Sequence, residues 1–295
     1  MRTTVAVTVW MCAAFGVVAS SARAGFTVTP GGIQFSDGPK GSAGNTTFLY
    51  TYTGPDTVIG SSTFGAGYSA LLTGSLPGEA CWNIKNTRFA STSGADFQMT
   101  RTGGGSGTIL VSSTPGAGMI LRSGDVLKFE AFESFNDGAG ADGAWTDLSW
   151  TFTDATVTSL GTFSSVSSIV TSGGAPPFGT DTKIGLYASD GTLIASNDDF
   201  GGAAGGGLAG LSLGAGTYYI AVLPWDAGVA GDIANGICSP GADASGPYSL
   251  AINGSTVASS TLATHETEWY SFTIPSPSGA MVLGIAAVGL CRRRR

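Results

Sequence analysis

Glycine interrupts this chain at short intervals. It supplies 47 of the 295 residues, and the stretches between glycines are rich in Thr, Ser, Val and aromatic residues. Such stretches favour short β-strands, and glycine suits the tight turns between them. No glycine triplet repeats as in collagen, and a charged fraction of 11% is too low for a coiled coil or a disordered polyampholyte. We therefore expect an all-β fold of antiparallel β-sandwich or jelly-roll-like domains, with apolar helices at the two ends.

The charge of the chain is divided unevenly between its ends and its middle. All 20 acidic residues lie between residues 25 and 274, together with only seven basic ones, so this middle carries a balance of −13. A surface this acidic repels phosphate backbones, which argues against nucleic acid as a partner. It suits a soluble body and divalent cations.

The first 24 residues have the layout of a secretory signal peptide. Arg2 gives a positive start, residues 5–18 form an apolar run, and residues 22–24 read Ala-Arg-Ala, the small-x-small form that signal peptidase cleaves. Cleavage is expected between Ala24 and Gly25. The alternative is a membrane anchor, for which the apolar run is short.

The other end of the chain has the layout of a sorting tail. Pro275, Ser276 and Pro277 precede an apolar run over residues 280–291, and the chain closes with Arg292, Arg293, Arg294 and Arg295. The prolines keep the first segment extended, the 18 residues from Ile274 to Cys291 are barely enough to span a bilayer, and the arginines resist translocation. The alternative is a plain tail anchor.

This tail resembles the PEP-CTERM sorting signal, in the Pro-Ser-Pro variant of planctomycete-like bacteria. Ser276 stands where the family usually has Glu, so the processing enzyme is left open. The resemblance implies an exported bacterial protein that is held in the membrane by its C-terminal helix. An exosortase-type transpeptidase then processes it and delivers it to the cell envelope, the outer surface or the extracellular matrix, near exopolysaccharide.

The body between the ends divides into two strand-rich blocks, residues 25–152 and residues 153–274. In the first, residues 47–52, 125–133 and 145–152 carry the alternation of a half-buried antiparallel sheet, and no family is recognised. In the second, strands are expected at residues 182–187, 192–196, 248–252 and 269–274, and two strand pieces within residues 211–222. Asp190 and Gly191 form a hairpin turn.

The second block resembles the bacterial pre-peptidase C-terminal (PPC) domain, a β-sandwich accessory module. The resemblance rests on the strand ending in Leu186 and Tyr187, the Asp190-Gly191 turn, the Asn-Asp-Asp of residues 197–199 and the Gly-Thr-Tyr-Tyr of residues 216–219. The long loop over residues 224–247 departs from the family. The resemblance implies a non-catalytic module that is sometimes supported by calcium.

Two groups of residues are candidates for binding. Asp181, Asn197, Asp198 and Asp199 offer hard oxygen ligands of the kind that Ca²⁺ prefers, although turn residues of this type also bond their own backbone. Trp225 follows Pro224 at a strand end and is the tryptophan best placed to stack on a sugar. No other cofactor is expected.

Two cysteines, Cys81 and Cys238, remain between the signal peptide and the tail. Export permits a disulfide between them, and a pair of buried free thiols is the equal alternative.

Catalytic motifs occur without the structural setting that they need. Residues 210–214 match G-x-S-x-G around Ser212, but a β-strand is expected there instead of the strand-to-helix turn of a hydrolase. His265 is the only histidine in the chain. We therefore predict a non-enzymatic envelope or matrix protein. A carbohydrate-binding or calcium-dependent adhesion module is the first alternative, and a secreted hydrolase with an accessory domain is the second.

Overall fold

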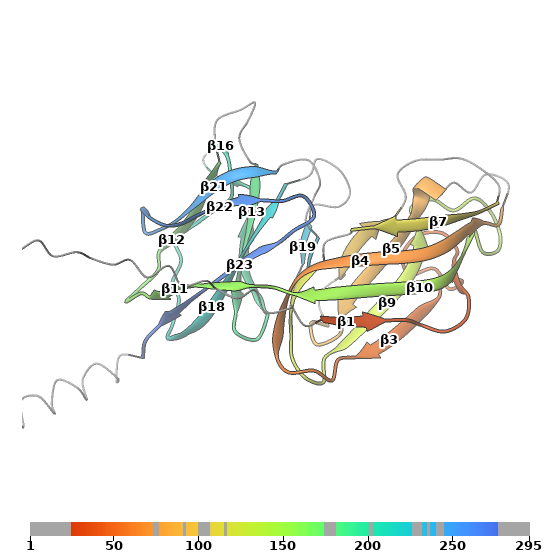
Figure 1. Ribbon diagram of the computed structural model, residues 1–295, viewed down its shortest axis with the longest axis horizontal. Coiled ribbons are helices and arrows are strands. Elements are labelled where there is room, and N and C mark those ends of the chain that lie inside the picture. Colours follow the sequence, from red (N-terminus) through yellow and green to blue (C-terminus); the bar gives the residue numbers. More distant parts are fainter. Residues whose placement is uncertain are drawn as a thin grey trace, which may run out of the picture.

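The computed structural model confirms the all-β prediction. The structure describes residues 25–72, 77–90, 93–99, 107–114, 117–173, 181–200, 203–225, 232–234, 237–239 and 245–276. Within these ranges the only helical element is a single 3-10 turn, η1 (Pro77–Glu79). The helices expected at the two ends lie outside the described residues. The strands form two β-sandwiches that stand side by side (Figure 1).

The first sandwich is built from two sheets. Sheet A has the order β1 (Gly25–Val28), β10 (Gly143–Asp154), β4 (Thr57–Ala70), β8 (Gly118–Leu121), β20 (Ile237–Ser239) and β19 (Asp232–Ala234). Beside this path, β2 (Gln34–Ser36) pairs with β10 and β7 (Gly107–Ser113) pairs with β4. Sheet B has the order β3 (Thr47–Thr51), β9 (Val126–Glu133), β5 (Ala80–Asn86) and β6 (Ala95–Gln98). All pairings in both sheets are antiparallel.

Aromatic side chains fill the space between sheets A and B. Trp82 of β5 packs against both Trp145 and Trp150 of β10, with ring centroids 5.7 and 6.5 Å apart. Trp145 and Trp150 are five positions apart, so simple alternation would put them on opposite faces. A β-bulge between Thr146 and Ser149, with Asp147 at φ 52°, shifts this alternation and brings both indoles into one core.

The second sandwich has a five-stranded and a four-stranded sheet. Sheet C has the order β11 (Val157–Thr162), β23 (Glu268–Ile274), β18 (Gly216–Pro224), β13 (Thr182–Ala188) and β14 (Leu193–Asn197), in which only β11 and β23 run parallel. Sheet D has the order β17 (Gly207–Ala209), β12 (Ser168–Gly173), β21 (Gly246–Ile252) and β22 (Ser255–Leu262). A two-stranded ribbon, β15 (Asp199–Phe200) with β16 (Ala203–Ala204), follows β14.

The strand β18 is buried on both of its faces. Ile220 and Val222 face the aliphatic core between sheets C and D. Ala221 and Leu223 belong to a separate cluster that joins the two sandwiches. One expectation here was wrong: residues 211–215 are irregular and a single strand begins only at Gly216. Because Gly214 and Gly216 interrupt the apolar run, the first piece has too few pairing residues to form a strand.

The two sandwiches are joined by packing and by shared backbone. Val58, Ile120, Tyr187, Leu223 and Trp269 form one buried cluster across the junction. The indole Nε1 of Trp269 donates to the carbonyl of Ile59 at 3.0 Å. The hairpin β19–β20, which lies in the long loop after β18, extends sheet A of the first sandwich through β8. The chain after β11 therefore completes both halves of the molecule.

Candidate functional site

The predicted calcium ligands gather at one end of sheet C, where β13 begins and β14 ends. Strands β13 and β14 are antiparallel, with Ile184 opposite Asn197, so the residues before β13 meet those after β14. Burial raises the pKa of Asp181, and the negative charges of Asp199 and Asp198 raise it further. The structure thus places these carboxyl groups close enough to repel one another.

Trp225 lies at the same end of the sheet, directly after β18. Its backbone N–H donates to the carbonyl of Asp181 at 3.0 Å, and its side chain is half-buried. Two predictions made from unrelated motifs therefore converge on one place. We call Asp181, Asn197, Asp198, Asp199 and Trp225 the acidic corner.

The acidic corner is negatively charged and contains a buried oxygen that has no hydrogen-bond partner among the described residues. That oxygen is Oδ1 of Asp181. Lys183 offsets part of the charge, since its Nζ lies 3.8 Å from Oδ2 of Asp198. Across the described ranges, no three side chains of His, Cys, Asp or Glu are grouped so that they could hold a metal ion. A calcium ion at the corner would therefore need backbone carbonyls and water as additional ligands.

A second group of carboxyls, which the sequence reasoning missed, is buried inside the first sandwich. Glu133 ends β9, where its Oε1 accepts from Ser36 Oγ at 2.5 Å and from Tyr68 OH at 2.9 Å. Asp142 lies beside it and accepts from the backbone N–H of Gly38 at 3.1 Å. Glu133 has the same parity in β9 as the core residues Leu127, Phe129 and Ala131, and this is the signal that could have found it.

These buried carboxyls are incompletely satisfied. Burial raises the pKa of Glu133 to about 7, against hydrogen bonds from Ser36 and Tyr68 that lower it, and the charges of Asp142 and Glu79 raise it further. Glu133 Oε2 and Asp142 Oδ1 have no hydrogen-bond partner among the described residues. A proton on Glu133 lowers the electrostatic cost of this arrangement.

The two cysteines are free and buried, which is the second of the two alternatives posed by the sequence. Cys81 lies in β5 of sheet B, and burial raises its pKa to about 12. Cys238 lies in β20 of sheet A, with its Sγ 3.0 Å from the hydroxyl of Tyr187. The thiols are therefore held on different sheets, and the raised pKa of Cys81 disfavours its reactive thiolate form.

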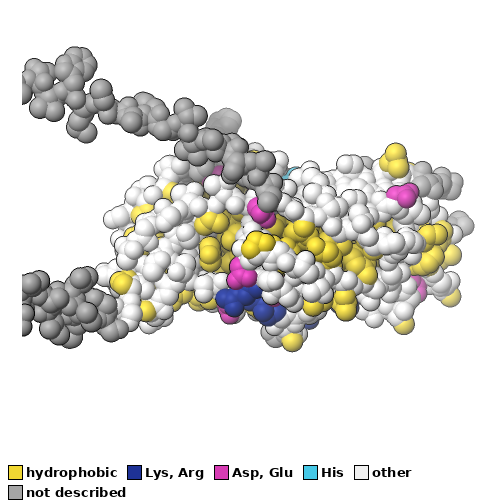
Figure 2. All heavy atoms as spheres, turned by 60° about the horizontal axis from the view of Figure 1, so that its bottom comes forward, with side chains coloured by type: hydrophobic (Ala, Val, Ile, Leu, Met, Phe, Trp, Pro, Cys, Tyr) yellow, Lys and Arg dark blue, Asp and Glu magenta, His cyan; other side chains and the backbone are white. Residues whose placement is uncertain are grey.

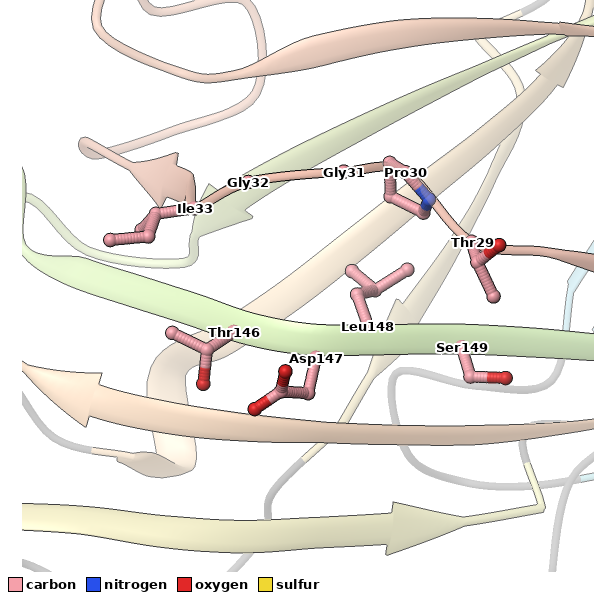
Figure 3. A pocket seen from close by; sticks show the side chains of 9 residues that line it. All are labelled: Thr29, Pro30, Gly31, Gly32, Ile33, Thr146, Asp147, Leu148 and Ser149. Atoms are coloured by element: carbon pink, nitrogen blue, oxygen red, sulfur yellow. The ribbon is translucent and has the colours of Figure 1, made fainter.

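The β10 bulge borders an open hollow of about 700 Å³. Residues 29–33, which link β1 to β2, run beside residues 146–149 of β10 across this hollow (Figure 3). Asp147 is the one ionisable side chain in its lining. Thr29, Thr146 and Ser149 add hydroxyl groups to the same lining.

The residues of the hydrolase alternative are not joined in the structure. Ser212 is exposed in the irregular segment before β18, and not in a strand as expected. His265 lies in the turn between β22 and β23 with φ 57°. No hydrogen bond within the described part of the chain links His265 to Ser212 or to a carboxylate.

The processing motifs lie at the borders of the described chain. Gly25 is the first residue of β1, and Pro275 and Ser276 are exposed directly after β23. Ala24, Pro277, Arg292, Arg293, Arg294 and Arg295 lie outside the described residues. Among the helices of the described residues, none has the length and hydropathy to cross a bilayer.

Comparison of the chain with protein-family models, with curated proteins and with solved structures gives no match in any of the three. The resemblances to the PEP-CTERM signal and to the PPC domain therefore rest on the quoted motifs, and they stay predictions.

Proposed function

We propose that the protein is an exported, non-catalytic component of a bacterial cell envelope or extracellular matrix, sorted through its PEP-CTERM-like tail by an exosortase-type enzyme. The observation that carries this proposal is that both predicted processing sites lie outside the described strands. The last of these strands, β23, ends at Ile274, directly before the predicted sorting motif, and cleavage after Ala24 would keep Gly25 and the rest of β1. Removal of both ends would leave every described strand in place.

The way the two sandwiches are joined supports a structural role. A buried apolar cluster and the hairpin β19–β20 tie them together. Apolar contacts and shared strand pairing across the junction oppose relative motion of the two halves. The surface in Figure 2 shows few charged side chains, consistent with a charged fraction of 11%. A body of two coupled sandwiches with few charged side chains is compatible with a structural role among uncharged polysaccharides.

Cell fractionation tests this proposal. In the native cells, the wild-type protein is expected in the envelope or matrix fraction. Replacing the four C-terminal arginines by alanine removes the stop to translocation, so more protein should appear free in the medium. Ser212→Ala, a change in an exposed loop, serves as the control and should leave the distribution unchanged. Wild-type protein found only in the cytoplasm would refute the proposal.

A second candidate function, calcium-dependent adhesion to carbohydrate, is favoured by the acidic corner. Oxygen ligands and a half-buried tryptophan lie together there, as such a site requires. Calcium in millimolar excess should raise the melting temperature of the wild-type protein, because a bound ion stabilises the folded state. Asp198→Asn with Asp199→Asn should abolish the rise, and Asp147→Asn, an exposed acid elsewhere, should keep it. No calcium response in the wild type would remove this candidate.

A further inference from the structure

A cleft of about 380 Å³ lies at the junction of the two sandwiches. The start of β4 and the end of β8 supply Asp56, Thr57, Ile120 and Arg122 from the first sandwich. Ser189 and Tyr219 face it from the second. Pockets between domains are common places for small ligands, and this volume is in the lower part of their usual range of about 300–1,000 Å³.

Arg122 contributes the one buried side-chain nitrogen of this lining that has no hydrogen-bond partner among the described residues, its Nε. Arg88, which also bridges the two sandwiches, is fully paired in contrast to the Arg122 Nε. Its guanidinium bonds both carboxylate oxygens of Asp125 and the carbonyl of Asp190. An unpaired buried donor is costly, so Arg122 is suited to an acceptor that a ligand brings.

The charge around the cleft decides what kind of acceptor this is. The lining itself carries one acidic residue, Asp56, and one basic residue, Arg122, so its two charges balance. Hydrogen bonds from Thr192 and the charges of Arg88 and Arg122 lower the pKa of Asp190 against the effect of its burial, so that carboxyl is ionised at neutral pH. A negative ligand gains nothing from this balance, whereas neutral hydroxyl groups can accept from an arginine and donate to a carboxylate.

The cleft also offers the rest of a sugar-binding surface. Asp56 accepts from the backbone N–H of Ser123 through Oδ1 at 3.1 Å, and its exposed side chain keeps acceptor capacity at Oδ2. Tyr219 is half-buried, and with Val58 and Val157 it forms an apolar wall. A sugar ring has this dual character, with an apolar face and a polar rim.

We propose that this cleft binds a neutral sugar residue, with the Arg122 guanidinium donating to its hydroxyl oxygens and the Asp56 carboxylate accepting from its hydroxyl groups. The sugar would be one unit of the matrix polysaccharide, so this inference rests on the proposed function and extends it. The cleft is separate from the acidic corner, since Tyr219 lies in the first half of β18 and Trp225 follows the end of that strand.

Saturation-transfer NMR on the full chain tests the site with methyl glycosides of glucose, galactose and mannose, and with methyl glucuronide as the charged counterpart. At least one neutral glycoside should bind, more strongly than the glucuronide. Arg122→Met and Asp56→Asn should each weaken binding at least tenfold, and Ser212→Ala, a change in an exposed segment away from the cleft, should leave it unchanged. Arg122→Met should also melt at or above the wild-type temperature, because it removes an unpaired buried donor. That combination separates a binding role from a structural one.

Three outcomes would overturn the inference. They are no binding by any of these glycosides, tighter binding of the glucuronide, and unaltered binding by Arg122→Met. None of these results bears on where the protein is found in the cell, so cell fractionation judges the proposed function separately.

Discussion

The two sandwiches solve the same packing problem with different side chains. The core of the first is aromatic, and in it Trp82 packs against both Trp145 and Trp150. The core of the second is mainly aliphatic, built around residues such as Ile184, Ile220 and Leu250. Trp145 and Trp150 have opposite parity in β10, and the β10 bulge brings both into the first core. In the second core, Ile184 and Leu186, like Ile220 and Val222, keep the same parity along their strands.

The halves also differ in how they bury polar groups. The first sandwich holds carboxyl oxygens and the indole N–H groups of Trp82, Trp145 and Trp150 without described partners. The second leaves fewer such atoms, Asp181 Oδ1, His265 Nδ1 and Thr267 Oγ1, and pairs other buried hydroxyls, as in Thr171 with Thr182 at 2.7 Å and Tyr248 with Tyr270 at 2.5 Å. The first half is therefore the more frustrated one, and we expect its stability to depend more on solution conditions.

The largest expected effect comes from the aromatic core. Trp150→Ala removes a fully buried indole and should lower the free energy of unfolding by about 3–5 kcal/mol. Urea denaturation followed by circular dichroism measures the change. Trp225→Ala, at a half-buried indole, is the matched control and should cost much less. Equal losses in the two variants would contradict the packing described for the first sandwich.

Stability should also depend on pH through Glu133. Its pKa is about 7 in the folded protein against an ordinary value of 4.5, so its contribution is fully present below pH 4.5 and is lost as the pH rises through 7. Between pH 5 and pH 8 the wild type should lose up to about 3 kcal/mol relative to Glu133→Gln. Denaturation at both pH values measures this difference.

Glu130 gives a control of opposite sign on the same strand. Hydrogen bonds from Gly41 and Asn45 and the charge of Lys128 lower its pKa against the effect of burial. Its stabilising contribution is therefore present at neutral pH and is lost as the pH falls. If Glu133→Gln and Glu130→Gln changed the pH profile in the same direction, the assignment of Glu133 would be wrong.

A smaller effect is expected at the junction of the sandwiches. Trp269→Phe keeps an aromatic ring but leaves the Ile59 carbonyl without its donor, which should cost about 1–3 kcal/mol. Calorimetry should show the single unfolding transition of the wild type broaden or split, because coupling between the halves is weakened. An unchanged, single transition at the wild-type temperature would show that this hydrogen bond does not hold the halves together.

The smallest effect is expected from the thiols. Because Cys81 and Cys238 are free and buried, a reducing agent should leave the melting temperature of the protein unchanged, and a thiol reagent should label neither cysteine before unfolding. A marked drop in melting temperature on reduction would instead indicate a disulfide between them.

Local patterns predicted much of the fold. The strand within residues 125–133 and the Asp190-Gly191 turn both appear where the sequence put them, in β9 and in the β13–β14 hairpin. These features depend on near neighbours in the chain, which is why a single sequence contains them. The half-buried alternation expected in that strand was wrong, because residues 129–133 are buried on both faces. The failure at residues 211–215 came from counting apolar residues without weighing the glycines between them.

Features that join distant parts of the chain were not predictable. The meeting of Asp181 with Trp225 follows from strand order, and the pairing of β20 with β8 spans the two sandwiches. The bulge at Asp147 contains no glycine, the residue that often indicates a bulge in a sequence. The cleft around Arg122 exists only because the two halves pack together, so no motif in either half could reveal it.

The central claim is that this protein is exported and trimmed at both ends. Intact-mass spectrometry of the protein purified from its native cells tests it most directly. The account predicts a mature chain that starts at Gly25 and lacks the four terminal arginines. A mature protein that still carries Arg292, Arg293, Arg294 and Arg295 would contradict it.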